Sequence, residues 1–281
     1  MTDWFRDDVH SAVASLDERA FQYGDGLFET IAIRGGKPRL WHYHLDRLDR
    51  GCECLGMAMP DHEQLRLSLQ KVLAQSSAEN DFCIVKIIVS SGTGNRGYGR
   101  KHISEPSIWF GVSHATPLPK SYYRDGVDTQ ICKTRLATGS ATAGLKTLNR
   151  LEQVLARSEL IEQNLFEGLT MDASGIIICG TMSNVFFVIK NRISTPALDQ
   201  CGVEGVMRRH VIATLEKHDI GVSDATVKWQ DLASVDEVFI TNSQFGILPL
   251  RSCGEISWSV GATTRNVMEC VSACGVPECR L

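Results

Sequence analysis

The chain has 281 residues, of which 43% are hydrophobic and 22% charged, a composition typical of a soluble globular enzyme. Its 29 basic and 33 acidic residues give a net charge of −4, which argues against a nucleic-acid-binding surface. No apolar run reaches the ~20 residues of a membrane-spanning helix, and the acidic segment 1–8 lacks the apolar stretch of a signal peptide. We therefore expect a cytoplasmic protein without nucleic-acid or membrane partners.

The first half of the chain alternates between strand and helix patterns. Aromatic and β-branched residues lead into Gly35 and Gly36, as in a β-hairpin, and apolar residues then recur at spacings of three and four, as in a helix. The elements predicted here are a hairpin at 28–33 and 37–41, helices at 42–56 and 61–75, and strands at 82–90 and 107–112.

Two irregular segments divide the chain. Residues 91–99 contain too many glycines for regular structure and predict a loop. Residues 115–126 hold two prolines and are interpreted as an interdomain linker. The predicted domains are therefore a smaller N-terminal α/β domain over 1–114 and a larger C-terminal domain over 127–281, which would carry Lys146.

The second half again mixes strands and helices. The elements predicted there are strands at 127–133, 185–190 and 236–241, a hairpin around 172–175, and helices at 149–164 and 205–218. Strands and helices in two halves indicate an α+β or mixed α/β architecture. The ten cysteines form no Cys-x-x-Cys pair, so we expect reduced, packed thiols and no metal site.

Lys146 stands out as a candidate catalytic residue. It lies in a glycine-containing turn, directly before a predicted helix that Asn149 could cap. A neutral lysine amine can attack an aldehyde, and burial or nearby cations would favour the neutral form. Because most lysines are solvated surface residues, this position alone is weak evidence.

A second candidate feature is an anion site. Glycines at 202 and 205 directly precede the predicted helix at 205–218, whose free N–H groups would attract a phosphate. A simple strand-to-helix turn would give the same pattern. The glycine loop that ends in Arg96-Gly97-Tyr98 could bring an arginine to a carboxylate, or it could be a flexible surface loop.

Three segments together resemble one family. The segment 143–153, the Tyr-Gly-Asp-Gly-Leu-Phe-Glu-Thr run at 23–30 and the Arg-Gly-Tyr loop at 96–98 are similar to those of fold type IV, branched-chain-aminotransferase-like enzymes that use pyridoxal 5'-phosphate (PLP). The similarity is greatest to the 4-amino-4-deoxychorismate lyases of that family. It extends from about residue 15 to about 250 and implies a two-domain, fold type IV architecture.

The resemblance also implies roles for particular residues. Lys146 would hold PLP as a Schiff base and act as the catalytic base. The residues implied to bind the phosphate are Arg47, Val206, Met207, Asn242 and Ser243, and those implied to contact the substrate are Phe28, Arg96 and Tyr98. The family also implies a homodimer and the conversion of 4-amino-4-deoxychorismate to 4-aminobenzoate and pyruvate in folate biosynthesis.

Cys179 departs from the family pattern. It occupies the place of a glutamate that pairs with the pyridine nitrogen of PLP, and a neutral thiol cannot supply that charge. A weaker electron sink should harm transamination more than a lyase reaction that ends in an aromatic ring. Two alternatives stay open: an aminotransferase for D-amino or branched-chain amino acids, and a non-catalytic relative that only binds PLP.

Overall fold

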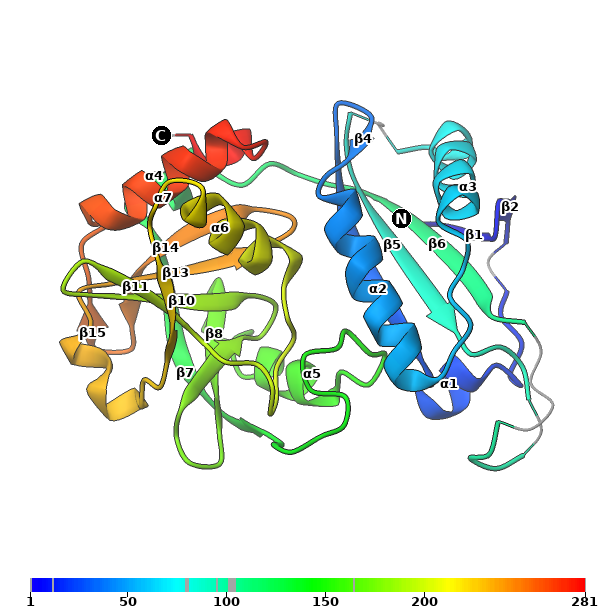
Figure 1. Ribbon diagram of the computed structural model, residues 1–281, viewed down its shortest axis with the longest axis horizontal. Coiled ribbons are helices and arrows are strands. Elements are labelled where there is room, and N and C mark those ends of the chain that lie inside the picture. The colour runs from blue at the N-terminus through cyan, green and yellow to red at the C-terminus, as the bar shows by residue number, and fades with distance from the viewer. Residues whose placement is uncertain are drawn as a thin grey trace. The chain divides into compact units, whose positions relative to one another are not determined.

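The computed structural model describes residues 2–11, 13–78, 81–94, 96–100, 105–163 and 165–280. The chain divides into two compact units, each described by itself below (Figure 1). Unit 1 comprises Met1–Pro117 and Leu145–Asn149, and unit 2 comprises Leu118–Gly144 and Arg150–Leu281.

Unit 1 is an antiparallel sheet with two long helices on one face. Its strands lie in the order β2-β1-β6-β5-β3-β4. The elements are β1 (Asp3–Arg6), β2 (Val9–His10), α1 (Arg19–Tyr23), β3 (Gly26–Arg34), β4 (Lys37–Pro38), α2 (Trp41–Leu55), α3 (His62–Gln75), β5 (Phe82–Ser90) and β6 (Ser107–His114).

The core of unit 1 follows from two periodicities. Alternate residues of β3 and β5, such as Leu27, Ile31 and Val85, point to the same face of the sheet because strand side chains repeat every two residues. Residues of α2 and α3 such as Leu48 and Leu69 join them in one apolar cluster. Burying this face fixes the register of β3, the strand on which the candidate site is built.

Unit 2 is built on a nine-stranded sheet in the order β12-β11-β10-β13-β14-β7-β8-β9, with β15 paired to β14. An additional pairing of β9 with β10 closes six of these strands into a ring. The elements are α4 (Lys120–Asp125), β7 (Val127–Leu136), α5 (Leu151–Ser158), β8 (Glu167–Asp172), β9 (Ile177–Gly180), β10 (Asn184–Ile189), β11 (Arg192–Pro196), α6 (Val206–Glu216), β12 (Val222–Ala225), the 3-10 turn η1 (Trp229–Ser234), β13 (Glu237–Asn242), β14 (Gly246–Cys253), β15 (Ile256–Ser257), α7 (Ala262–Ala273) and the 3-10 turn η2 (Pro277–Cys279).

The structure confirms most of the predicted elements, including the β3–β4 hairpin, both helices of unit 1 and the α6 helix. The helix predicted over 149–164 is shorter, because α5 ends at Ser158. The predicted linker 115–126 contains the short helix α4. All ten cysteines lie in the described ranges, and none of them forms a disulfide there. None of the helices in the described ranges is long and apolar enough to cross a membrane.

Candidate active site

Lys146 belongs to unit 1 because its backbone pairs with β3. The Phe28 amide donates to the Lys146 carbonyl at 3.0 Å, and the Leu148 amide donates to the Gly26 carbonyl at 3.0 Å. The grouping of residues 145–149 with unit 1 differs from the domain boundaries expected from the sequence, which placed Lys146 in the C-terminal domain. Residues 145–149 group with unit 1 because this short backbone pairing fixes Lys146 against β3, a strand of the unit 1 core.

The Lys146 amine lies over an aromatic ring. Its Nζ is 4.2 Å from the centroid of the Phe28 ring, within the range of a cation–π contact. A second amine, Lys86 Nζ, lies 4.8 Å from the same centroid, and burial lowers the pKa of Lys86. Phe28 and Lys146, both expected in the site, are therefore brought together; the contact of Phe28 with substrate stays a prediction.

Asn149 does not cap the helix that follows Lys146, so that expectation is wrong. The α5 helix begins at Leu151, with Arg150 as its N-cap residue and no side-chain cap bond. The Asn149 Nδ2 instead donates to the Gly24 carbonyl at 3.0 Å. Gly24 has a φ of +63°, and a Cβ there would lie 2.6 Å from Asn149 Oδ1, so only glycine fits beneath this side chain.

Asp25 ties the glycine loop to the body of unit 1. Its carboxylate accepts from Arg19 Nε at 2.7 Å, from Ser91 Oγ at 2.7 Å and from Arg100. Arg19 in turn donates to the carbonyls of Gly97 and Tyr98, each at 3.0 Å. Burial would raise the pKa of Asp25, but the hydrogen bonds from Arg100, Arg19 and Ser91 and the charge of Arg100 together outweigh burial and lower it. The Gly-Asp-Gly segment therefore holds the backbone of the Arg-Gly-Tyr loop.

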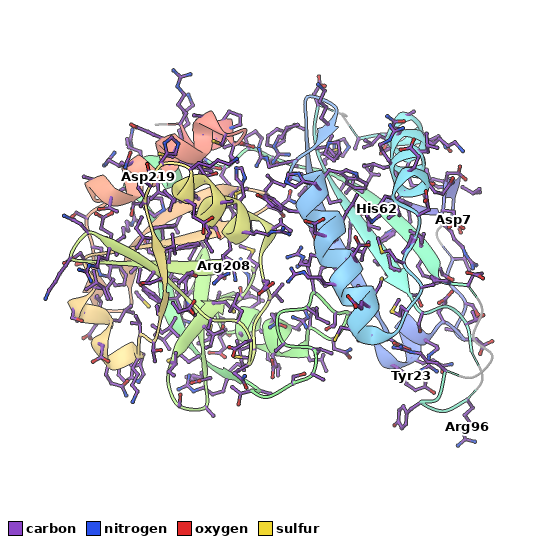
Figure 2. The ribbon with its side chains drawn as sticks, in the orientation of Figure 1. Asp7, Tyr23, His62, Arg96, Arg208 and Asp219 are labelled. Atoms are coloured by element: carbon purple, nitrogen blue, oxygen red, sulfur yellow. The ribbon has the colours of Figure 1, made fainter. Side chains whose placement is uncertain are left out.

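The side chains of that loop are exposed. Tyr98 is 86% exposed and meets the edge of Tyr23 with ring centroids 5.4 Å apart. Arg96 is also exposed, and Figure 2 shows it at the outer end of the loop, directed away from the ribbon. Their contact with substrate remains a prediction. Asn95, in the same loop, lies outside the described residues.

Arg47 forms a buried ionic cluster with Glu29 and His44. Its Nε donates to Glu29 Oε1 at 2.8 Å and its Nη2 to Glu29 Oε2 at 2.5 Å. His44 Nδ1 lies 2.6 Å from Glu29 Oε2. Burial alone would raise the pKa of Glu29, but the charge of Arg47 and the hydrogen bonds from Arg47 and His44 lower it to about 2. The sequence predicted Arg47 as a site residue and missed its two partners.

In unit 2, the start of α6 offers backbone donors. Gly205 is the N-cap residue in an extended conformation, with no side-chain cap bond, and Val206 and Met207 form the first turn. Arg208, labelled in Figure 2, anchors this turn by donating through Nη2 to the Pro196 carbonyl at 3.1 Å. The two predicted phosphate ligands thus lie at a helix N-terminus, where N–H groups favour an anion.

Polar side chains surround this N-terminus and fit a phosphate. Asn184 Nδ2 donates to the Val203 carbonyl at 2.9 Å, and a Cβ on Gly205 would lie only 1.9 Å from Asn184 Oδ1. Asn184 pairs in register with Thr241 of β13. The Thr241 hydroxyl is buried and has no hydrogen-bond partner among the described residues. An unsatisfied hydroxyl beside a helix N-terminus is the kind of donor that a bound phosphate group requires.

Asn242 ends β13, and Ser243 begins the turn that follows it. The Asn242 Oδ1 accepts from the backbone amides of Gln244 at 2.8 Å and Phe245 at 3.0 Å. The Asn242 side chain is therefore engaged in shaping the turn, so its predicted part in phosphate binding would fall to its backbone N–H. The roles of both residues stay predictions.

Glu167 is a buried carboxylate that the sequence reasoning missed. It is 0% exposed and accepts from the backbone of Thr181 at 3.0 Å and from the Ser183 hydroxyl at 2.7 Å. The turn it holds leads directly into Asn184. The sequence did hold a signal for Glu167: a glutamate stands among the apolar residues of 160–171. A charged side chain inside a buried strand needs hydrogen-bonding partners, which predicts a cluster around it.

Cys179 lies on β9 in an apolar setting. Its Sγ is 3.3 Å from Thr170 Oγ1, and it packs in a cluster with Ile178, Leu198 and Cys201. Burial raises the pKa of Cys179 to about 12, so the thiol stays neutral. Arg150 is near enough for its charge to oppose this shift in the pKa of Cys179. That Cys179 faces the pyridine nitrogen stays a prediction.

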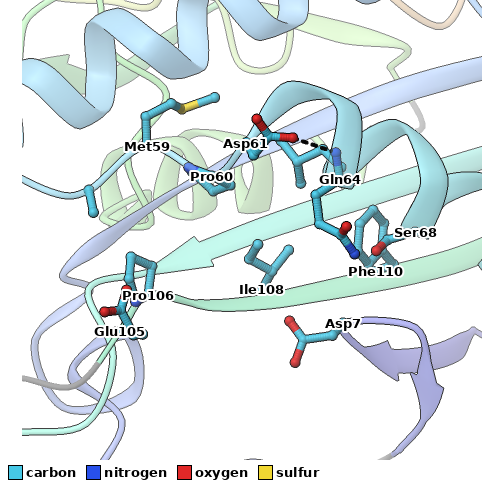
Figure 3. Close-up of a pocket in the computed structure, with 12 residues that line it drawn as sticks. Asp7, Met59, Pro60, Asp61, Gln64, Ser68, Glu105, Pro106, Ile108 and Phe110 are labelled. Atoms are coloured by element: carbon cyan, nitrogen blue, oxygen red, sulfur yellow. Dashed lines mark hydrogen bonds between the residues drawn. The ribbon is translucent and has the colours of Figure 1, made fainter.

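A separate cavity of about 330 Å³ lies in unit 1 between α3 and β6 (Figure 3). Met59, Ile108 and Phe110 supply apolar walls, and the Asp61 that borders it caps α3 by accepting from the Gln64 amide at 2.8 Å. The residues that the sequence assigned to cofactor or substrate are absent from this lining. We therefore assign it no part in the candidate site.

Comparison with known proteins supports the resemblance read from the sequence. A family model described as amino-transferase class IV matches residues 26–253. An aminodeoxychorismate lyase of Vibrio harveyi is 32% identical over 257 residues, which cover 90% of this chain and 93% of that protein.

Solved structures agree with this comparison. The crystal structure of 4-amino-4-deoxychorismate lyase from Pseudomonas aeruginosa is 37% identical, with a TM-score of 0.86 and coverage of 96% of this chain and 98% of that one. A branched-chain amino acid aminotransferase of Escherichia coli reaches the same TM-score of 0.86 at 19% identity, covering 98% and 95% of the two chains, and shows the fold alone.

Proposed function

The chain belongs to the class IV aminotransferase family, and we propose that it is a PLP-dependent lyase converting 4-amino-4-deoxychorismate to 4-aminobenzoate and pyruvate in folate biosynthesis. The observation that carries this proposal is the similarity to two aminodeoxychorismate lyases over at least 90% of the chain. The pairing of the Lys146 backbone with β3, beside Phe28, supports the proposal that Lys146 is the nucleophile that such an enzyme needs.

Lys146 has two tasks in this reaction. When bound, PLP supplies an aldehyde carbon and an electron-withdrawing ring. The Lys146 amine would hold the cofactor. The same amine would remove the proton from the substrate ring carbon that bears nitrogen, and would give a proton to the departing enolpyruvate, which becomes pyruvate. The fixed backbone of Lys146 keeps the amine in place for both transfers.

We propose that the residues expected from the sequence hold the phosphate. Arg47 would supply a guanidinium held by Glu29. The N–H groups of Val206 and Met207 lie at the start of α6. The unsatisfied hydroxyl of Thr241 supports the same assignment. We further propose that Asn242 and Ser243 complete this set and that Arg96 and Tyr98 contact the substrate carboxylates.

Cys179 favours the lyase over the aminotransferase alternative. The buried thiol is neutral and cannot keep a pyridine nitrogen protonated as a carboxylate does. Transamination depends on a strong electron sink, whereas loss of pyruvate is assisted by formation of the aromatic ring. The similarity to the E. coli aminotransferase is a similarity of fold only, and it gives the aminotransferase alternative no further support.

A homodimer in the cytoplasm is proposed with the activity. The exposed face of α5 supports the dimer: Leu151, Val154 and Leu155 are 76%, 56% and 59% exposed and lie three and four residues apart, on one side of the helix. Contiguous exposed apolar side chains commonly mark a protein–protein contact. Sedimentation at micromolar concentration should give a mass near twice the 31.0 kDa of the chain.

The activity is tested with the purified, PLP-loaded protein. Supplied with 4-amino-4-deoxychorismate and no keto acid, it should release pyruvate and fluorescent 4-aminobenzoate in equal amounts. Lys146→Ala is the matched inactive control. Strict dependence on added 2-oxoglutarate, with an amino acid as product, would establish the aminotransferase alternative, and PLP binding without either product would establish a non-catalytic relative.

A further inference from the structure

The cluster of Glu29, His44 and Arg47 interrupts an apolar contact between β3 and α2. On β3, Leu27 and Ile31 point into the core two residues before and after Glu29, so Glu29 occupies a position where the strand period requires an apolar side chain. Glu29, His44 and Arg47 are only 2%, 1% and 6% exposed. Three ionisable side chains therefore fill part of a helix–sheet core.

The geometry of the cluster fixes its protonation. A carboxylate accepts hydrogen bonds only, so the Nδ1 of His44 that faces Glu29 Oε2 at 2.6 Å carries the proton. Burial lowers the pKa of His44, and together with the positive charges of Arg47 and Lys146 it outweighs the charge and hydrogen bond of Glu29, which raise that pKa; the ring is therefore neutral. The second nitrogen, Nε2, is buried without a hydrogen-bond partner in the described structure.

Stability does not explain this arrangement. A buried ion pair can often be replaced by apolar side chains of similar volume with no loss of stability, because desolvation offsets the attraction. The unsatisfied Nε2 of His44 adds a further cost. The cluster lies close to the proposed site, since the charge of Lys146 acts on His44 and the ring beneath the Lys146 amine belongs to Phe28, next to Glu29.

We propose that Glu29 and His44 are positioning residues that set the orientation of the Arg47 guanidinium for a phosphate. Glu29 grips Nε and Nη2 of Arg47 in two-point fashion, which fixes the plane of the guanidinium and the direction of its other N–H groups. The Nδ1–H of His44 donates to Glu29 Oε2, the same oxygen that accepts from Arg47 Nη2, and so fixes the position of that oxygen. The inference rests on the proposed function, in which Arg47 binds the phosphate of PLP.

The test is PLP affinity, measured by absorbance titration of the apoprotein, beside its thermal stability. Glu29→Gln removes the two-point grip and should raise the Kd of PLP about tenfold or more. His44→Asn keeps an N–H donor in the place of Nδ1 and should leave the Kd within about threefold. His44→Leu fills the space without a donor and should raise the Kd about tenfold, even if it melts no lower than His44→Asn.

A role that is only structural predicts the reverse order for the two histidine variants. The apolar leucine would then match or exceed asparagine in stability and affinity together, because a buried apolar side chain leaves no unsatisfied group. A better affinity for asparagine than for leucine, without better stability, supports positioning. Equal PLP affinity in the wild type, Glu29→Gln and His44→Leu would overturn it.

A double variant shows whether Glu29 acts through Arg47. Arg47→Ala should weaken PLP binding and also destabilise the fold, because it leaves the Glu29 carboxylate buried and unpaired. Adding Glu29→Gln should restore stability but change the Kd no further, since the group being positioned is already gone. A further, additive rise in Kd would contradict the inference.

The failures of the two proposals are distinguishable. If the wild-type protein binds no PLP, or if Arg47→Ala leaves its affinity unchanged, the phosphate assignment in the proposed function fails and takes this inference with it. If Arg47→Ala weakens PLP binding but the variants at Glu29 and His44 do not, the proposed function stands and the positioning role alone is refuted.

Discussion

Replacing Glu167 by glutamine is expected to destabilise the turn that leads into β10. The side chain is fully buried. Its Oε1 accepts from the Gly168 amide at 3.0 Å and from the Thr181 amide and hydroxyl at 3.0 and 2.5 Å. Its Oε2 accepts from the Met182 amide at 3.2 Å and from the Ser183 hydroxyl at 2.7 Å. Every one of these partners donates, so only an acceptor satisfies them.

The magnitude follows from what glutamine can accept. Its amide nitrogen would take the place of Oε2, where the Ser183 hydroxyl can turn to accept but the Met182 amide loses its acceptor. A buried N–H without a partner costs about 1–3 kcal/mol. The bonds to the remaining oxygen weaken as a charged acceptor becomes neutral, and relief of the buried charge offsets part of that loss. We expect a decrease of about 2–4 kcal/mol in the free energy of unfolding.

The assay is urea unfolding of the apoprotein, with Glu159→Gln as the matched control. Glu159 also accepts three bonds, from the Lys133 amide at 2.6 Å and from the Thr134 amide and hydroxyl at 2.9 and 2.6 Å, but it is only partly buried. Water can replace the lost acceptor there, so the control should lose less than about 1 kcal/mol. Equal losses in the two variants would refute the argument from burial.

Four further predictions address the candidate site. Borohydride reduction of the PLP-loaded protein should attach the cofactor to the peptide containing Lys146, and a label on another lysine would refute the assignment. Asp25→Asn should raise the KM for substrate by about tenfold with little change in PLP affinity, because it frees the backbone of the Arg-Gly-Tyr loop; an unchanged KM would show that the loop needs no such anchor. Because the pKa of Glu29 is lowered to about 2 in the fold, its stabilising contribution is complete above its unfolded pKa of ~4.3 and is lost as the pH falls towards 2; Glu29→Gln should flatten this part of the stability profile measured by denaturation between pH 5 and pH 2. Cys179→Glu should change the cofactor absorption spectrum and raise any transaminase side activity more than lyase activity, and an unchanged spectrum in a folded variant would place Cys179 away from the pyridine nitrogen.

The spacing of apolar residues and the residue types at turns predicted the helices and strands that carry the candidate site. The helix over 42–56 and the strand over 82–90 match α2 and β5 within one residue at each end, because both segments bury one regular apolar face. The predicted end of the helix over 149–164 is wrong, because α5 ends at Ser158. Apolar residues continue beyond α5, but Leu160 packs into a small core cluster from a turn outside the helix. A periodic pattern does not distinguish these two cases.

The side-chain partners of the site were beyond sequence reasoning. Lys146 and Arg47 are proposed as site residues from the resemblance, and their surroundings depend on pairs of residues far apart in the chain. Glu29 meets Arg47 18 residues later, and the Phe28 amide meets the Lys146 carbonyl only because residues 145–149 add to the edge of β3. No local rule states which distant strand a five-residue segment will join. A charged residue in an apolar strand pattern, such as Glu29 or Glu167, was the one available signal for these clusters.

The fold does not decide between lyase and aminotransferase, so the decision falls to individual side chains. An E. coli aminotransferase and a P. aeruginosa lyase match this chain with the same TM-score of 0.86, although their identities are 19% and 37%. We propose Cys179 as one such side chain. Its sulfur lies 3.3 Å from Thr170 Oγ1 in an apolar cluster, and burial keeps the thiol neutral. A carboxylate placed there would need a cationic partner to offset its burial, and Arg150 is the nearby cation whose charge already acts on Cys179. If Arg150 paired with the new carboxylate, the negative charge of that carboxylate would no longer be available to the ring nitrogen of PLP. The absorption spectrum of Cys179→Glu therefore tests two things together: whether residue 179 lies at the ring nitrogen, and whether Arg150 pairs with the new carboxylate. Combining Cys179→Glu with Arg150→Met removes the arginine and separates the two.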